Sequence, residues 1–189
     1  MKLVPTALPG VVIVEPAVFA DERGWFMESF NAPRFDAALA ALGLPPPGPF
    51  VQDNHSCSAA GVLRGLHYQL PPHAQGKLVR VVKGAAYDVA VDIRQGSPSF
   101  GRWVGVELSA DNKRQLWIPP GFAHGFLALV DDTHFLYKTT DVYAKECERA
   151  IRWDDAAIGI AWPLPGRLAP RLAEKDAAAP GLGDAEVVR

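Results

Sequence analysis

Hydrophobic and polar residues alternate through most of the middle of the chain, which is the pattern of half-buried β-strands. In 87–94, the residues Tyr87, Val89, Val91 and Ile93 occupy every second position, the period that places side chains on one face of a strand. Turn residues recur at intervals of roughly ten residues between such runs. We therefore predict an all-β sandwich or barrel. Its strands are expected over 11–15, 25–30, 50–58, 62–69, 77–83, 86–94, 102–109, 115–118, 122–130 and 133–139.

One segment near the N-terminus has helical spacing instead. Phe35 and Leu39 are four residues apart and give this segment an apolar stripe. Asn31 is a favourable N-cap residue, and Gly43 stands where helices commonly end in the left-handed conformation. We predict a single short helix over 31–42.

Composition and charge are those of one globular domain. The 189 residues are 49% hydrophobic and 21% charged, with a formal net charge of −2, which suits one sizeable core. No basic tract and no apolar run of membrane length is present, so we expect neither nucleic acid nor a membrane as a partner. The tail after Pro163 is rich in Pro, Gly and Ala and is expected either to wrap the barrel or to fray.

The cysteines and the start of the chain bear on location. Cys57 and Cys147 are the only two cysteines, and their spacing fits neither a metal motif nor a disulfide framework. Each is expected to be a buried or partly buried free thiol. The N-terminal stretch does not combine a basic start, an apolar run and a cleavage site. These features favour a reducing, cytoplasmic location.

Histidine spacing does not favour a metal centre. The chain contains five histidines but no H-x-H pair, although catalytic zinc and iron sites need three or four ligands and often draw on such pairs. We therefore expect no metal. A three-histidine site assembled from distant strands is the alternative that spacing leaves open.

Two candidate groups, His67 and Lys77, flank the turn at 71–76. If the strands on either side form a hairpin, the two side chains lie opposite each other and share one face. Arg64 then points to the other face unless a bulge at Gly65 reverses it. The alternative is a surface hairpin with solvated charges, and spacing alone favours that alternative.

Longer ordered motifs carry more information than these spacings. They are FVQDNHS at 50–56, GVLRGLHYQ at 61–69, AQGKLVR at 74–80, FLYK at 135–138, IRWDD at 151–155 and LAEKD at 172–176. Together they resemble the dTDP-4-dehydrorhamnose 3,5-epimerase family, and the resemblance extends over nearly the whole chain.

The resemblance implies a fold, a reaction and an assembly. The implied fold is a cupin-like jelly-roll β-barrel with its core at about 50–140, forming a single sugar-nucleotide epimerase domain over 1–189. The implied substrate is dTDP-4-dehydro-6-deoxy-glucose, a dTDP-linked 4-keto-6-deoxy sugar. Its product, dTDP-4-dehydro-L-rhamnose, leads to L-rhamnose for bacterial surface polysaccharide. A homodimer without metal or cofactor is also implied.

The resemblance implies four catalytic residues. His67 is similar to the family base that removes a proton beside the keto group, and a neutral imidazole suits that task. Asp176 resembles the carboxylate that orients this imidazole. Lys77 resembles the cation that faces the developing oxyanion. Tyr137 resembles the acid that returns a proton to the opposite face, although by itself it is typical of a core or rim aromatic.

Further positions resemble substrate contacts of the family. Arg23, Phe26 and Glu28 belong to a segment that is expected to reach across the dimer. The remaining expected contacts are Gln52, Asp53, Asn54, Arg64, Lys77, His124, Tyr143, Glu148 and Lys175. For Asp53 and Glu148, a scaffold role is an equal alternative.

Two other functions are compatible with this sequence. A relative that inverts only one carbon of a dTDP-4-keto-deoxysugar differs by small changes in the pocket, which one sequence does not reveal. A non-catalytic sugar-nucleotide-binding cupin is the second alternative. The retention of His67, Lys77 and Tyr137 argues against it, because a binding protein does not need a full acid–base set.

Overall fold

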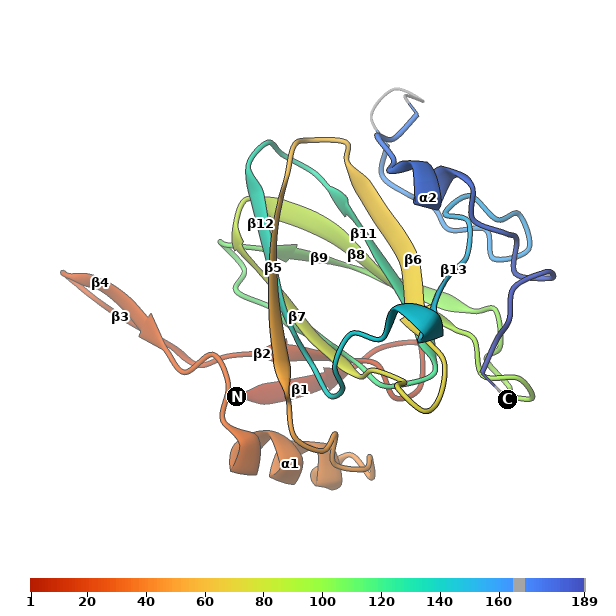
Figure 1. Cartoon of the computed structure of the whole chain (residues 1–189). Coiled ribbons are helices and arrows are strands. Elements are labelled where there is room, and N and C mark those ends of the chain that lie inside the picture. Colours follow the sequence, from red (N-terminus) through yellow and green to blue (C-terminus); the bar gives the residue numbers. More distant parts are fainter. Residues whose placement is uncertain (165–168, 189) are drawn as a thin grey trace.

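Two antiparallel sheets face each other in the computed structural model, which describes residues 1–164 and 169–188 (Figure 1). One sheet has six strands in the order β1 (Lys2–Pro5), β2 (Val12–Glu15), β10 (Gln115–Ile118), β7 (Lys77–Lys83), β12 (Thr133–Thr139) and β5 (Gln52–Ser58). The other has five strands in the order β13 (Glu148–Ala150), β6 (Leu63–Gln69), β11 (Phe122–Ala128), β8 (Ala85–Asp92) and β9 (Trp103–Ser109).

Every strand predicted from alternation is present, with ends that differ by a few residues. The cupin-like all-β fold is therefore confirmed. Over the described ranges, however, no hydrogen-bonded ladder joins one sheet to the other, so the expected barrel is an open pair of sheets. The strands β1, β13 and β3 (Val18–Asp21), each three or four residues long, were not predicted.

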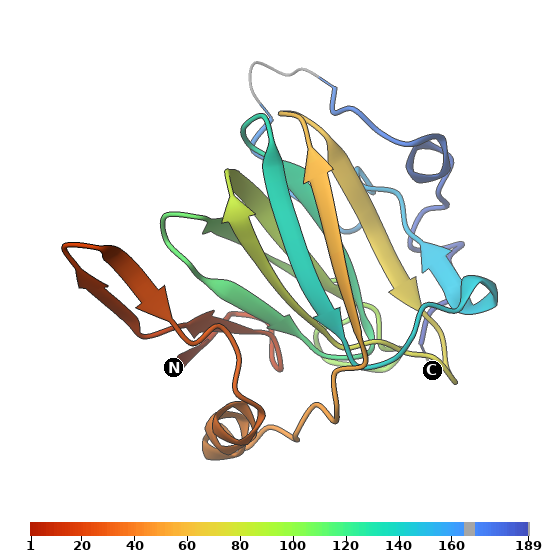
Figure 2. The same ribbon diagram turned by 60° about the vertical axis from the view of Figure 1, so that its left-hand side comes forward.

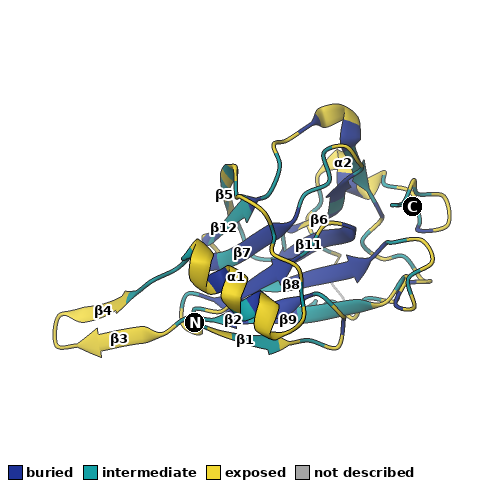
Figure 3. Cartoon of the chain, turned by 90° about the horizontal axis from the view of Figure 1, so that it is seen from below, coloured by how far each residue is buried: buried dark blue, intermediate teal, exposed yellow. Residues whose placement is uncertain are grey.

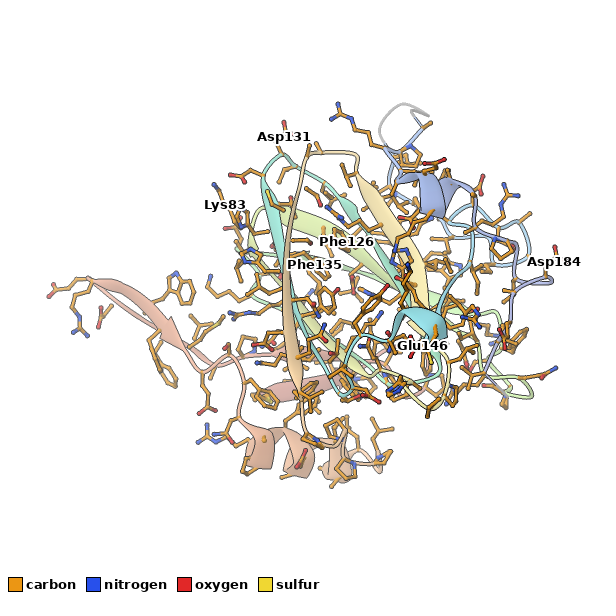
Figure 4. The ribbon with its side chains drawn as sticks, viewed as in Figure 1. Lys83, Phe126, Asp131, Phe135, Glu146 and Asp184 are labelled. Atoms are coloured by element: carbon orange, nitrogen blue, oxygen red, sulfur yellow. The ribbon has the colours of Figure 1, made fainter. Side chains whose placement is uncertain are left out.

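The main hydrophobic core fills the space between the two sheets. Phe126 of β11 and Phe135 of β12 stack face to face at its centre, with ring centroids 4.0 Å apart (Figure 4). Both are almost fully buried, as are Val79 of β7 and Leu116 of β10. Inward-facing residues from both sheets thus interdigitate in one core.

The helix α1 (Ala32–Ala41) covers the outer face of the six-stranded sheet (Figure 2). The Asn31 side chain accepts a hydrogen bond from the Arg34 backbone N–H at 3.2 Å, as predicted for an N-cap. Phe35 and Leu39 are fully buried, and Phe35 packs edge-on against Trp117. The predicted helix is confirmed.

The C-terminal tail wraps the five-stranded sheet, as expected. Its backbone pairs in parallel at two points, Val62 with Arg171 and Arg94 with Val188. Between them, the short helix α2 (Glu174–Ala177) lies beside β6. Over residues 1–164 and 169–188, no helix is long and apolar enough to cross a membrane.

The strands β6 and β7 do not form the hairpin considered above. They belong to different sheets: β6 pairs with β11 and β13, and β7 pairs with β10 and β12. The proline-containing connection at 70–76 passes from one sheet to the other instead of reversing within one. His67 and Lys77 therefore approach each other across the two sheets and not along one ladder.

A two-stranded arm projects from the body of the molecule. It consists of β3 and β4 (Gly24–Met27), which pair with each other and, within the described part of the chain, with no further strand (Figure 3). Large apolar side chains on it are solvent-exposed in the single chain, including Phe19 at 66% and Phe26 at 70%. Such a surface is expected to contact another protein surface.

Candidate active site

A cavity of about 590 Å³ opens between the two sheets, beside the tail. Strands β5, β7 and β12 supply one wall, and β6, β11 and α2 supply the other. Most of the site residues expected from the sequence line this cavity: Gln52, Asn54, Arg64, His67, Lys77, His124, Tyr137, Tyr143, Glu148, Lys175 and Asp176.

His67 and Asp176 form a hydrogen-bonded pair at the cavity wall. His67 Nε2 lies 2.6 Å from Asp176 Oδ1, and the Gly65 N–H donates to Asp176 Oδ2 at 3.4 Å. Burial acts to raise the pKa of Asp176, but its hydrogen bond with His67 holds that pKa below the ordinary value. An ionised Asp176 accepts the Nε2 proton, so the lone pair of His67 is on Nδ1.

A β-bulge in β6 brings Arg64 to the same cavity as His67. Along β11 the partners of these residues are Phe126 and His124, so the two residues Gly65 and Leu66 of β6 oppose the single residue Gly125 of β11. Gly65 makes this possible, because it has a φ of +120° and a Cβ there would lie 2.6 Å from Gly125 Cα. The bulge considered from the sequence is therefore present.

Lys77 lies buried at the base of the cavity. Its ammonium donates to the backbone carbonyl of His67 at 3.3 Å. Burial lowers the pKa of Lys77 to about 8, although the nearby carboxylates of Asp88 and Glu148 act to raise it. Lys77 is thus a desolvated cation in contact with the backbone of His67.

A second imidazole–carboxylate pair lies beside Lys77. His124 Nε2 is 2.7 Å from Asp88 Oδ1, and both side chains are buried. Burial raises the pKa of Asp88 and lowers the pKa of His124. The second oxygen, Asp88 Oδ2, has no hydrogen-bond partner within the described parts of the chain. Asp88 was missed by sequence reasoning, although a carboxylate within the apolar alternation of 87–94 is a readable signal.

Tyr137 faces the cavity from the opposite sheet to His67. It lies on β12 of the six-stranded sheet, whereas His67 lies on β6 of the five-stranded sheet. Burial raises the pKa of the Tyr137 phenol above its ordinary value, more than the nearby Arg64 cation lowers it. The phenol therefore stays protonated near neutral pH.

Polar side chains form a hydrogen-bonded rim at the cavity mouth. Lys175 pairs with Glu148 at 3.0 Å, and the Tyr143 hydroxyl donates to the same carboxylate at 3.1 Å. Gln52 donates to Asn54 at 2.9 Å and accepts from the Tyr143 N–H at 3.0 Å. These hydrogen bonds link the tail to β5 at the mouth of the cavity.

Four expected contacts lie outside this cavity. Asp53 occupies the outer face of β5, because it alternates with Gln52 and Asn54, and it pairs with Lys138 at 2.9 Å. Arg23 pairs with Asp21 on the arm. Phe26 and Glu28 also belong to the arm and its base, away from the cavity of their own chain.

Several cavity residues were not expected from the sequence. They include Gln69, Gln75, Phe126 and Arg171. Arg171 reaches the cavity because the tail pairs in parallel with Val62. No local sequence pattern predicts such a contact, because it depends on where a proline-rich tail crosses a strand that is distant in sequence.

Comparison with known proteins agrees with this geometry. The model of the dTDP-4-dehydrorhamnose 3,5-epimerase family matches residues 5–184. A dTDP-4-dehydrorhamnose 3,5-epimerase from Shigella flexneri is 58% identical over 176 residues, which cover 93% of this chain and 93% of that protein.

Two solved structures extend the comparison to the fold. A dTDP-6-deoxy-D-glucose-3,5-epimerase from Legionella pneumophila, in complex with dTDP-4-keto-L-rhamnose, superposes with a TM-score of 0.91 at 49% identity, covering 100% of this chain and 97% of that chain. A 3'-monoepimerase from Streptomyces bikiniensis, in complex with dTDP-quinovose, gives 0.85 at 35% identity, covering 97% and 88% respectively. This chain therefore belongs to the dTDP-4-dehydrorhamnose 3,5-epimerase family of isomerases.

Proposed function

We propose that this enzyme inverts C3 and C5 of dTDP-4-dehydro-6-deoxy-glucose to give dTDP-4-dehydro-L-rhamnose, by proton transfer through an enolate. The observation that carries this proposal is the arrangement of His67 and Tyr137, which line one cavity from opposite sheets. A sugar ring held between the sheets is met by a base on one face and an acid on the other. Inversion of a carbon requires that two-sided arrangement.

His67 is the proposed base. The 4-keto group acidifies the hydrogens on C3 and C5, and Nδ1 of His67 carries the lone pair that removes one of them. Asp176 holds the imidazole in this tautomer through the 2.6 Å hydrogen bond and stabilises the imidazolium that forms. Asp176 is buried, so water does not compete for that bond.

Lys77 and His124 are proposed to bind the enolate oxygen. As the C–H bond breaks, negative charge moves onto the oxygen of the keto group. Lys77 is buried, and a preorganised cation that is shielded from water stabilises an oxyanion most strongly. His124 is fixed by Asp88 at 2.7 Å, which leaves its other ring nitrogen for the substrate.

Tyr137 is the proposed acid. Its raised pKa keeps the phenol protonated, so it donates to the carbon on the face opposite His67. His67 then carries the proton that it removed, and exchange with water resets both groups. Repeating the sequence at the second carbon inverts C3 and C5 in turn.

Cations beside the reacting groups suit the diphosphate of the nucleotide. Arg64 and Lys175 line the same cavity, and guanidinium and ammonium groups are the usual ligands of phosphate oxygens. We propose that the arm of a second copy completes the site, with Arg23, Phe26 and Glu28 of one protomer reaching the nucleotide bound by its partner.

The reaction needs no metal or cofactor in this proposal. A base, an orienting carboxylate, a cation and an acid supply every proton transfer and neutralise the enolate. We propose that the whole chain acts as one epimerase domain and works in the cytoplasm on the route to L-rhamnose. Activity that disappears on exhaustive chelation and returns with one equivalent of metal would contradict metal independence.

Solvent deuterium uptake tests the proposed reaction. The enzyme is incubated with dTDP-4-dehydro-6-deoxy-glucose in deuterated water, and proton NMR locates the label. Deuterium at both C3 and C5 of an inverted product is expected. Label at one carbon alone indicates a monoepimerase, the activity named for the Streptomyces bikiniensis structure. A complete absence of label indicates a non-catalytic binding protein.

A further inference from the structure

A cluster of metal-ligand side chains lies on the outer face of the six-stranded sheet, where the proposed reaction does not use it. Cys57 of β5 is directly opposite His134 of β12, and Asp132 lies in the turn that leads into β12. These residues are at the same end of the molecule as Lys83 and Asp131 (Figure 4). Asn54, His55 and Ser56 of β5 line the cavity, but none of Cys57, Asp132 and His134 is among its lining residues.

The potential ligand atoms of this cluster converge on Asp132. The Cys57 thiol donates to Asp132 Oδ1 at 3.3 Å, and His134 Nε2 lies 2.9 Å from the same oxygen. The three atoms lie within 4.8 Å of one another. Thiolate, imidazole and carboxylate groups bind zinc at about 2.0–2.3 Å, which separates neighbouring ligand atoms in a tetrahedral site by about 3.3–3.6 Å. The two contacts with Asp132 are already close to this spacing, and the thiol and the imidazole lie within 4.8 Å of each other, so side-chain adjustments can bring all three ligands around one ion.

His55 supplies the outer support that metal-binding histidines need. Its Nε2 lies 2.9 Å from His134 Nδ1. If His134 donates its Nδ1 proton to His55, the lone pair is on Nε2, the atom that points toward Asp132 and Cys57. Ligating histidines usually have their second nitrogen fixed in this way. Cys57, Asp132 and His134 thus form a ligand set, and His55 orients His134.

We propose that Cys57, Asp132 and His134 bind one divalent transition-metal ion of zinc-like preference, with His55 orienting His134 and solvent in the fourth position. The thiolate and carboxylate neutralise the two positive charges of the ion. The thiol proton is released to solvent as the sulfur–metal bond forms. All three ligands are at least partly exposed in the chain, so the ion has access from solvent.

In the metal-free chain Lys83 pairs with Asp132, so a metal ion must compete with its ammonium for that carboxylate. The Lys83 ammonium pairs with Asp132 Oδ2, and the Cys57 thiol donates its proton to Asp132 Oδ1. The ion must therefore displace a thiol proton next to an existing cation. Replacing Lys83 by Met is expected to increase metal affinity, because it removes that positive charge and leaves the three ligands in place.

The bound ion would link an edge strand to its neighbour. β5 is the last strand of its sheet, and its inner residues Gln52 and Asn54 form part of the cavity rim. A ligand that binds only the folded chain stabilises it. Metal binding is therefore expected to raise the unfolding temperature without taking part in proton transfer.

Titration of the metal-free full chain with Co²⁺ alone tests this proposal. One equivalent per chain is expected, with a thiolate-to-metal charge-transfer band in the near ultraviolet. Cys57→Ser should abolish the band, and His134→Ala should weaken binding at least tenfold. His55→Ala is expected to weaken it about tenfold, as measured for outer-sphere partners of other metal sites.

Two matched variants separate this site from the remaining thiol and from the cavity. Cys147→Ser removes the other cysteine, and His67→Asn removes a cavity imidazole; both are expected to keep the band and the stoichiometry. A wild-type chain without a thiolate band would overturn the proposal. So would a band that survives Cys57→Ser, or one that disappears with His67→Asn, because the metal then binds elsewhere.

Discussion

Lys77 is a charged group of the site whose burial destabilises the folded state. The ammonium is buried and, over the described residues, makes no salt bridge; its one hydrogen bond goes to a backbone carbonyl. Burial lowers its pKa from 10.5 to about 8, so the folded state binds this proton less tightly than the unfolded state does. The difference corresponds to roughly 3 kcal/mol below pH 8.

Replacing Lys77 by Met is therefore expected to stabilise the protein at pH 7 by roughly 1–3 kcal/mol. The same change should reduce epimerisation at least about 10²-fold, because it removes the cation that faces the enolate. Urea unfolding and turnover, measured on the same preparation, check both effects. Lys138→Met, on the outer surface beside Asp53, is the control and should change stability by less than about 0.5 kcal/mol. A strongly destabilised K77M protein would contradict this account of burial.

The pKa of Lys77 also predicts a pH dependence. In the free enzyme the ammonium loses its proton near pH 8, so kcat/KM should fall as pH rises through that value. Stability should change in the opposite direction. Between about pH 8 and 10.5 the unfolded chain binds more protons at this residue than the folded chain, and unfolding becomes less favourable as pH rises. If the pH profile of K77R lacks the alkaline decrease in kcat/KM, titration of Lys77 causes that decrease. If the K77R profile is the same as that of the wild type, another group causes it.

Asp176 offers a test of the orienting pair. Asp176→Asn keeps the size of the side chain but replaces a carboxylate that accepts the His67 proton with an amide. We expect turnover to fall about 10²- to 10⁴-fold, with little change in substrate binding. Asp184→Asn, also in the tail but on its exposed surface (Figure 4), is the matched control. Equal activity of the two variants would exclude an orienting role.

Residue types and order could be read from the sequence, but their environments could not. His67, Lys77 and Tyr137 stand in motifs that resemble one family, and that resemblance identifies candidates. The burial of Lys77 and its pKa depend on how the fold brings β7, β8 and β13 together, with Asp88 and Glu148 beside the ammonium. Alternation along one strand does not predict the distances between side chains on different strands.

The bulge in β6 shows what an irregular element contributes to the site. One extra residue in this strand turns both Arg64 and His67 toward the cavity, although regular alternation would separate them. The close approach of Gly65 to Gly125 fixes the position of the bulge. Catalysis therefore depends on a glycine that has no reactive group.

Gly65→Ala should disrupt this element. A Cβ at this position would meet Gly125 Cα at 2.6 Å and the His124 carbonyl oxygen at 2.7 Å, at a φ of +120°. We expect a loss of more than about 2 kcal/mol in unfolding free energy, together with most of the activity. Gly183→Ala, where nothing lies within 4 Å of the added Cβ, should be nearly neutral. A stable and active G65A enzyme would show that the bulge tolerates a side chain.

Strands and helix were largely predictable, and their pairing was not. Alternation located β7, β10 and β12 with their observed ends, and capping residues located α1. The assignment of β6 and β7 to different sheets follows from the core between them, which is a property of the assembled structure. A turn rich in proline is equally compatible with a hairpin and with a crossing between sheets.

At the scale of the whole molecule, the arm pairs with no further strand of the described residues, although Lys113 lies over its Trp25 ring at 4.8 Å. Phe19, Trp25 and Phe26 are more than half exposed, and burial of such side chains contributes about 1.5–3 kcal/mol each. The sequence resemblance implies a homodimer, but one chain does not reveal where the arm of a second copy would lie. The single-chain cavity also lacks the three expected contacts that belong to this segment.

We predict a homodimer held in part by this arm. Light scattering at micromolar concentration should give twice the chain mass, and the double substitution of Trp25 and Phe26 by Ser should shift the protein toward monomer. Substrate binding should weaken in parallel if the arm completes the partner's site. Val142→Ser, another exposed apolar position outside the arm, is the control. A fully active wild-type monomer would contradict this assembly.

The division of work between His67 and Tyr137 is the central claim, and it is tested by measuring exchange and inversion on the same sample. In deuterated water, Tyr137→Phe should still exchange substrate hydrogen through His67 while forming little inverted product, because only the opposite-face donor is missing. His67→Ala should lose both exchange and inversion, by about 10²-fold or more. Exchange that disappears in Tyr137→Phe but persists in His67→Ala would reverse the assignment of base and acid.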